Sequence, residues 1–152
     1  MDETQTKPTA SPSFQPVFNC TGLMPDFARA AVVYFLPVFA VAFLLGVVRQ
    51  LLVIPLTGPL IAVALEVPVI LILSWWVAAK VLHRWPLPLQ GRLAMGALAF
   101  VILMLAELAL ALAFGQTPRQ FLAAMASPAG ALGLAGQVGF ALIPAFRRQP
   151  TG

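Results

Sequence analysis

Long apolar runs alternate with short polar stretches along the chain, and each run has about the length that a helix needs to cross a bilayer. A transmembrane helix requires about 20 predominantly apolar residues. The pattern predicts four such helices, at about 25–54, 59–80, 93–115 and 121–146. Because backbone polar groups in lipid must be satisfied within a helix or a closed barrel, we expect an all-α polytopic membrane protein. Its fold class is a four-transmembrane-helix bundle with short loops.

Prolines and glycines mark the ends of these segments. Pro25 suits a first helical position, where its missing N–H would have no helical partner. Pro55 is expected to end the first helix, and the stretch from Pro55 to Pro59 is expected to form a compact turn into the second. Gly115 is expected to end the third helix.

The start of the last segment has two alternatives. Thr117-Pro118 and Ser127-Pro128 each combine a helix cap with a first-turn proline. In one alternative a single kinked helix starts near Phe121. In the other, a short interfacial helix is followed by a crossing that starts near Pro128 and is just long enough to span the membrane.

Composition strengthens the membrane assignment. Of the 152 residues, 61% are hydrophobic and 9% are charged, whereas soluble domains hold about 45–50% apolar and about 25% charged residues. The length predicts one membrane domain, over residues 24–148. Residues 1–23 are rich in Pro, Ser and Thr and are expected to form a disordered cytoplasmic tail, and 149–152 a short C-terminal tail.

Basic residues predict the orientation of the four spans. With four crossings, both termini and the middle loop share one side of the membrane. That side carries seven of the nine basic residues, namely Lys7, Arg29, Lys80, Arg84, Arg92, Arg147 and Arg148. The other side carries Arg49 and Arg119. Because short loops rich in Lys and Arg stay in the cytoplasm, we expect a multi-pass protein of the bacterial inner (plasma) membrane with both termini cytoplasmic.

Each predicted helix also carries one polar residue at a similar depth. These residues are Arg49, Glu66, Glu107 and Gln137, and at helical rise they lie about 9–13 Å from the outer helix ends. Ionisable groups inside a bilayer are costly and usually have a partner or a function. We therefore expect an intramembrane polar cluster in which Arg49 forms a forked pair with one carboxylate. The second carboxylate leaves one negative charge in excess, which a bound proton would neutralise.

Two further patterns concern helix geometry. Pro68 is expected to kink the second helix, because it removes the hydrogen bond to the carbonyl of Ala64, one turn from Glu66. Small residues in the last segment let helices approach closely, and the repeated ones are Gly130, Gly133, Gly136 and Gly139. Helix packing within the chain is one use of this stripe, and a homo-oligomer interface is the other.

The remaining candidates lie outside the spans. Lys80, Arg84 and Arg92 are expected to contact lipid headgroups. His83 lies beside them without a second histidine, so we expect no metal site. The single cysteine, Cys20, excludes a disulfide within the chain. The sequence contains no phosphate-binding loop, nucleophile elbow or zinc-protease motif, and we expect no catalytic residues, no cofactor and no enzymatic activity.

These observations leave two hypotheses for function. The leading one is a structural or accessory inner-membrane protein. Its expected partners are membrane lipids together with further copies of itself or a larger membrane complex, and not nucleic acid. The alternative is a small transporter, or a proton- or ion-conducting protein, that uses Arg49, Glu66 and Glu107.

Overall fold

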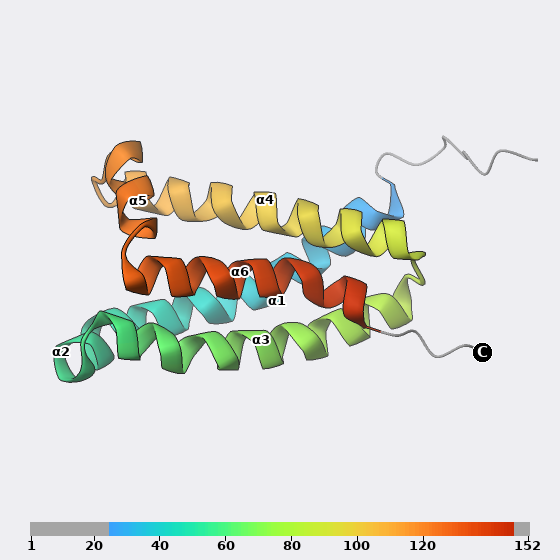
Figure 1. Cartoon of the computed structure of the whole chain (residues 1–152). Coiled ribbons are helices and arrows are strands. Elements are labelled where there is room, and N and C mark those ends of the chain that lie inside the picture. The colour runs from blue at the N-terminus through green and yellow to red at the C-terminus, as the bar shows by residue number, and fades with distance from the viewer. Residues whose placement is uncertain (1–24, 148–152) are drawn as a thin grey trace, which may run out of the picture.

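The structure is a computed structural model that describes residues 25–147, and that part of the chain is helical apart from its turns (Figure 1). The helices are α1 (Asp26–Val48), η1 (Arg49–Val53), α2 (Ile54–Thr57), α3 (Pro59–Arg84), α4 (Leu89–Ala113), α5 (Pro118–Met125) and α6 (Pro128–Phe146). Four helical segments are long and apolar enough to cross a membrane, with α1, η1 and α2 forming the first. The expected all-α four-helix fold is confirmed. The tails expected at 1–23 and 149–152 lie outside the described residues.

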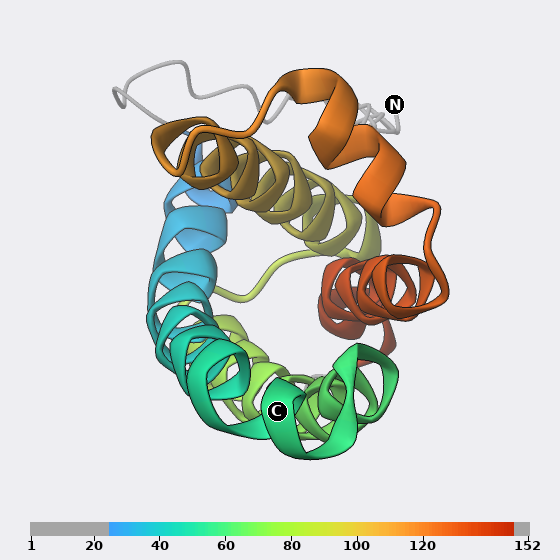
Figure 2. The same ribbon diagram turned by 90° about the vertical axis from the view of Figure 1, so that its left-hand side faces the viewer.

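The four long helices form a ring (Figure 2). α1 packs against α3 and α4, and α6 packs against the same two helices. In the described chain, α1 and α6 therefore lie diagonally opposite each other, as do α3 and α4. The short connection of residues 85–88 thus joins two diagonal helices rather than two neighbours.

The first span continues past the point where we expected it to end. Pro55 was expected to terminate the helix, but helical structure runs on to Thr57. A π-helical turn precedes this proline, and within it the N–H of Ile54 donates to the carbonyl of Arg49, five residues back. The wider turn gives the proline ring room that a regular α-helix would deny it. The helix stops instead at Gly58, whose φ of 81° is a conformation that favours glycine.

The last span begins at Pro128, as in the second of the two alternatives, and a single helix over 121–146 is not formed. Ser127 caps α6 by accepting a hydrogen bond from the N–H of Gly130. A separate short helix, α5, starts at Pro118 behind a reciprocal cap between Thr117 and Gln120. Two complete caps ten residues apart in the sequence specify two helices rather than one kinked one.

The middle connection is shorter than expected. α3 runs to Arg84 rather than to residue 80, and α4 begins at Leu89 rather than at residue 93. Lys and Arg are good helix formers. Their long side chains also reach water from a helix end near a membrane surface, so the first charge does not end the helix.

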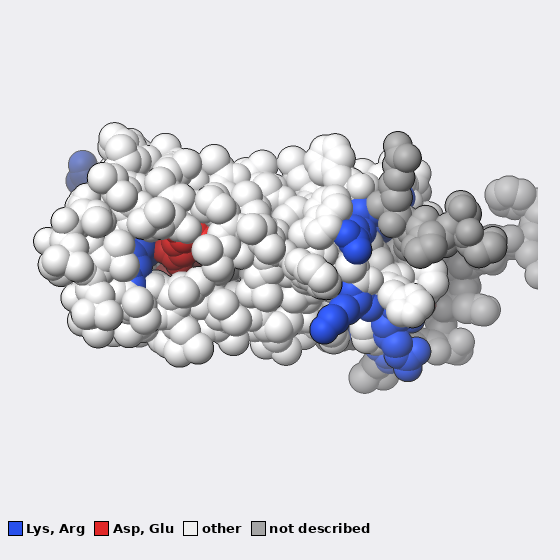
Figure 3. Space-filling model, turned by 90° about the horizontal axis from the view of Figure 1, so that it is seen from below, with Lys and Arg blue, Asp and Glu red and all other residues white. Residues whose placement is uncertain are grey.

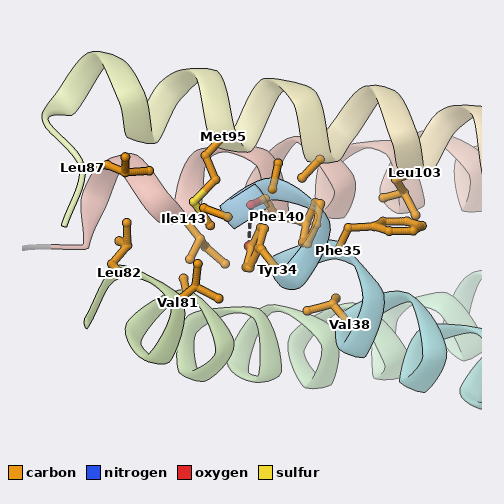
Figure 4. Packing of buried hydrophobic residues seen from close by; sticks show 14 residues of the cluster. Tyr34, Phe35, Val38, Val81, Leu82, Leu87, Met95, Leu103, Phe140 and Ile143 are labelled. Carbon is orange, nitrogen blue, oxygen red and sulfur yellow. Dashed lines mark hydrogen bonds between the residues drawn. The ribbon is translucent and has the colours of Figure 1, made fainter. Parts of the chain in front are cut away.

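Most buried side chains gather in one half of the bundle, which we call the closed half. They come from α1 up to Val38, α3 from Ala78, α4 up to Leu103 and α6 from Phe140 (Figure 4). The termini of the described chain and the α3–α4 connection lie at this end (Figure 1). We call the other half, which contains η1, α2 and α5, the open half.

Tyr34 and Phe140 join the diagonal helices α1 and α6 in the closed half. The Tyr34 hydroxyl donates to the backbone carbonyl of Phe140 over 2.8 Å, and the two rings stack with centroids 4.6 Å apart (Figure 4). That carbonyl would ordinarily accept from the N–H four residues on, but Pro144 has none. Tyr34 therefore supplies the hydrogen bond that the proline removes, and it does so in a fully buried place.

The glycines of α6 pack within the chain. A Cβ on Gly133, Gly136 or Gly139 would meet side chains of α3 at 4.0, 3.0 and 3.0 Å respectively. Gly130 instead adjoins the backbone of α5, since its Cβ would come within 2.1 Å of the Ala124 carbonyl oxygen. Two long helices also approach closely at Gly96, whose Cβ would lie 1.9 Å from the carbonyl oxygen of Ala141. The sequence reasoning did not single out Gly96.

Candidate functional site

A partly open cavity of about 810 Å³ lies between the helices of the open half. Its floor is formed by residues of the closed half, among them Phe140 and Val38. Most of its wall is apolar and rich in phenylalanine, with Phe35, Phe39, Phe43, Phe114, Phe121 and Phe140 all lining it. A volume in this range and a wall of this kind are typical of small-molecule sites.

All four polar residues of the predicted intramembrane cluster line this cavity. Arg49 and Glu66 form an ion pair, with Nη1 of the guanidinium 2.7 Å from Oε2 of the carboxylate. The Arg49 side chain is 33% exposed and the Glu66 side chain 14%, so the pair is largely shielded yet still borders open space. It ties the end of the first span to α3.

Glu107 and Gln137 form a second pair, between α4 and α6. The amide Nε2 of Gln137 donates to both carboxylate oxygens of Glu107, over 2.6 and 2.7 Å. This partner is neutral, so the carboxylate gains hydrogen bonds without a compensating charge. The two carboxylates thus have different partners, since Glu66 faces a cation and Glu107 faces an amide.

The two pairs leave hydrogen-bonding capacity unused. Nε of Arg49 and Oε1 of Gln137 are buried and have no hydrogen-bond partner within the described part of the chain. With both carboxylates ionised, the lining carries one positive and two negative charges. Figure 3 shows an acidic patch beside a basic one in a hollow of the open half, while most other basic side chains gather at the opposite end.

The π-helical turn positions Arg49. η1 begins at this residue, immediately after the regular helix ends at Val48. A π turn inserts one extra residue and so rotates the following side chains relative to an uninterrupted helix. Gln50 in the same turn also lines the cavity. Such turns are frequent at functional sites.

The sequence reasoning missed the aromatic wall. Phe35, Phe39 and Phe43 are spaced four residues apart, which places them on one face of a helix. Their rings follow one another at centroid distances of 4.9 and 6.4 Å. This spacing was a visible signal. Gln116 and Ser127 also line the cavity near its outer end, but as helix-end residues they carried no such signal.

The other predicted residues lie away from the cavity. Lys80 and Arg84 are exposed at the closed end, and their contact with lipid headgroups stays a prediction. Arg92 is half-buried, and its Nη1 donates to the carbonyls of Ala145 and Arg147, so it caps the C-terminus of α6. Pro68 lies inside α3, which continues through it without interruption, and the expected kink stays a prediction. Within the described residues, no group of three possible metal-binding side chains occurs.

The fold and the site together define a small multi-pass membrane protein with four candidate spans and, between them, a largely apolar cavity that contains a polar cluster. Comparison with models of known protein families, with curated proteins and with solved structures finds no match for this chain.

Proposed function

We propose that this chain is a small membrane transport protein that binds its solute in the cavity of the open half. The observation that carries the proposal is that one cavity collects every acidic side chain in the interior of the described spans, namely Glu66 and Glu107, together with Arg49 and Gln137. Ionisable groups at such a depth mark substrate and ion pathways.

The proposal accounts for two features that a purely structural layer leaves unexplained. A layer that only fixes helix register is expected to satisfy its own polar groups, yet two of the three buried side-chain polar atoms without a hydrogen bond or ion pair in the described chain, Arg49 Nε and Gln137 Oε1, belong to residues that line this cavity, and the third is Arg92 Nε. Protein interiors are also normally close-packed, yet about 810 Å³ is left between these helices. Both features fit a site that receives a further molecule.

A structural or accessory role remains the second candidate. It is favoured by the brevity of the connections, since residues 85–88 and 114–117 are all that join α3 to α4 and α4 to α5. Little of the described chain is available outside the spans for catalysis, so the proposed function is not enzymatic. In this role the protein would act through lipid, through further copies of itself or through a larger membrane complex.

The proposed location is the bacterial inner membrane, with both termini in the cytoplasm. Support comes from the basic residues at the closed end, which are Arg29, Lys80, Arg84, Arg92 and Arg147. At the open end only Arg49 and Arg119 are basic among the described residues. With the positive side inside, the cavity lies in the outer half of the membrane.

Access of water to the cavity tests the proposed function. In a Cys20→Ser background, Ala42→Cys places a thiol on the cavity wall. Leu105→Cys places one on the outer surface of α4, near the level of Glu107, where the native side chain is 61% exposed. Because thiolates form in water and not in lipid, we expect a charged thiol reagent applied to both sides of proteoliposomes to label Ala42→Cys roughly ten times faster. Equal rates would refute an aqueous cavity and favour the accessory role.

A further inference from the structure

We infer that the solute of this cavity is an amphiphilic organic cation and that the Glu107 carboxylate is its counter-ion. This inference rests on the proposed function and names the substrate class of the same site. It follows from three properties of the open half: an unbalanced charge, an aromatic wall and the volume between the helices.

The two carboxylates differ in the charge that lies beside them. Glu66 has a cation 2.7 Å away, in the guanidinium of Arg49. Glu107 forms no ion pair with another described residue: the amide of Gln137 donates to both of its oxygens but brings no charge, and Arg49, already paired with Glu66, acts on it only beyond ion-pair distance. A carboxylate inside a membrane is costly unless a positive charge or a proton accompanies it. The site therefore favours a positively charged occupant at Glu107.

The apolar, phenylalanine-rich wall of the cavity decides what kind of cation fits. Small inorganic cations require several oxygen ligands, and the cavity lining offers mainly apolar side chains. Phenylalanine faces attract organic cations and also bury apolar carbon. Phe39, Phe43 and Phe140 belong to this lining together with Glu107. An organic cation with an apolar body satisfies the wall and the carboxylate at once.

The volume of the cavity limits the size of the solute. About 810 Å³ lies in the range of sites that hold drug-sized molecules rather than single ions. The hollow also reaches the surface of the open half, where charged side chains are visible from outside (Figure 3). A proton or a small ion would leave most of this space without a role.

The test uses two probes of matched size and opposite charge, tetraphenylphosphonium and tetraphenylborate. Both partition into lipid, so binding to the full chain in lipid nanodiscs is measured by equilibrium dialysis against nanodiscs without protein. We expect saturable binding of one tetraphenylphosphonium per chain and no saturable binding of tetraphenylborate. Equal binding of the two ions, or no binding of the cation, would overturn the inference without any variant.

Variants then locate the counter-ion. We expect Glu107→Gln to weaken cation binding by at least about tenfold, which corresponds to about 1.4 kcal/mol. Glu107→Asp keeps the charge and is expected to retain most of the affinity. Asp26→Asn changes the net charge of the protein equally, but Asp26 lies exposed at the start of α1, and binding is expected to stay within a factor of about two. Unchanged binding in a folded Glu107→Gln protein contradicts the assignment.

The two proposals fail separately. If the Ala42→Cys thiol is labelled rapidly but tetraphenylphosphonium does not bind, the cavity is aqueous and the substrate class is wrong. If that thiol is labelled no faster than the one at Leu105, the proposed function itself fails. Retention of tetraphenylphosphonium binding in Glu107→Gln with its loss in Glu66→Gln would move the counter-ion to the other carboxylate and overturn this inference alone.

Discussion

The closed and open halves of this bundle are built from the same four helices but differ in what fills the space between them. In the closed half, Tyr34 and Phe140 meet across the diagonal, and Met95 of α4 is fully buried beside them. In the open half the hydrogen-bonded and ion-paired side chains join neighbouring helices, in the pairs Arg49–Glu66 and Glu107–Gln137. Packing closes one end, and polar pairs border a cavity at the other.

This difference indicates that the closed half stabilises the fold and the open half provides the binding site. A closed half with a complete core can hold the four helices in place, so the other half need not be filled to keep the fold. The same arrangement places the polar side chains of the open half on helices that are held rigidly in the closed half. A binding site requires such rigid support. If this division holds, substitutions in the closed half will change stability most, and those in the open half will change binding.

The largest expected effect compares two phenylalanines. Phe140 is 2% exposed and stacks on Tyr34, whereas Phe43 is 40% exposed on the cavity wall. Phe140→Ala leaves a void in a packed layer and is expected to lower the free energy of unfolding by about 3–5 kcal/mol. Phe43→Ala is expected to lower it by less than about 1 kcal/mol, because its environment is already open. Unfolding by SDS in mixed micelles measures both, and equal losses would refute the division.

A second comparison uses two glycines. Gly96→Ala directs a methyl group at the backbone carbonyl of Ala141, which cannot move aside without separating α4 from α6. We expect a loss of about 3 kcal/mol, at the upper end of overpacking costs. Gly46, which lines the cavity, has nothing within 4 Å of its Cβ position. Gly46→Ala is therefore expected to be neutral or to stabilise by about 0.5–1 kcal/mol, since alanine is the better helix former.

These glycines also show where sequence reasoning reaches its limit. The number of spans was predictable because hydropathy over about 20 residues is a strong and local signal. The close approach of Gly96 to Ala141 was not, since it depends on how α4 and α6 are rotated and displaced relative to each other. The end of the first span was misplaced because Pro55 normally breaks a helix, and only the π turn before it permits continuation.

For the candidate site too, one part was predictable from the sequence and another was not. Counting residues from the helix ends was enough to place Arg49, Glu66, Glu107 and Gln137 at similar depths. Their partners could not be derived by counting. The expected forked pair left the choice of carboxylate open, and the structure joins Arg49 to Glu66 through one guanidinium nitrogen. Pairing depends on helix rotation, and the π turn at Arg49 changes that rotation locally.

The third prediction isolates the hydrogen bond across the diagonal. Tyr34→Phe keeps the stacked ring but removes the donor to the Phe140 carbonyl, leaving it buried without a partner. We expect a loss of about 2 kcal/mol in unfolding free energy. Pro144→Ala restores an N–H four residues after Phe140, so in the double variant the cost of Tyr34→Phe should largely disappear. A double-mutant cycle measures this coupling, and additive losses would show that Tyr34 does not replace the missing helical bond.

The smallest expected effect lies in the open half. Gln137→Leu removes the amide that donates to both oxygens of Glu107. Hydrogen bonds between membrane helices contribute near 0.6 kcal/mol on average, and this one borders a cavity rather than a packed core. We expect a stability loss of about that size, measured by the same SDS titration. Cation binding is expected to change more than stability, because the amide fixes the orientation of the carboxylate. A loss as large as that of Phe140→Ala would mean that the polar pairs, and not the closed half, hold the bundle together.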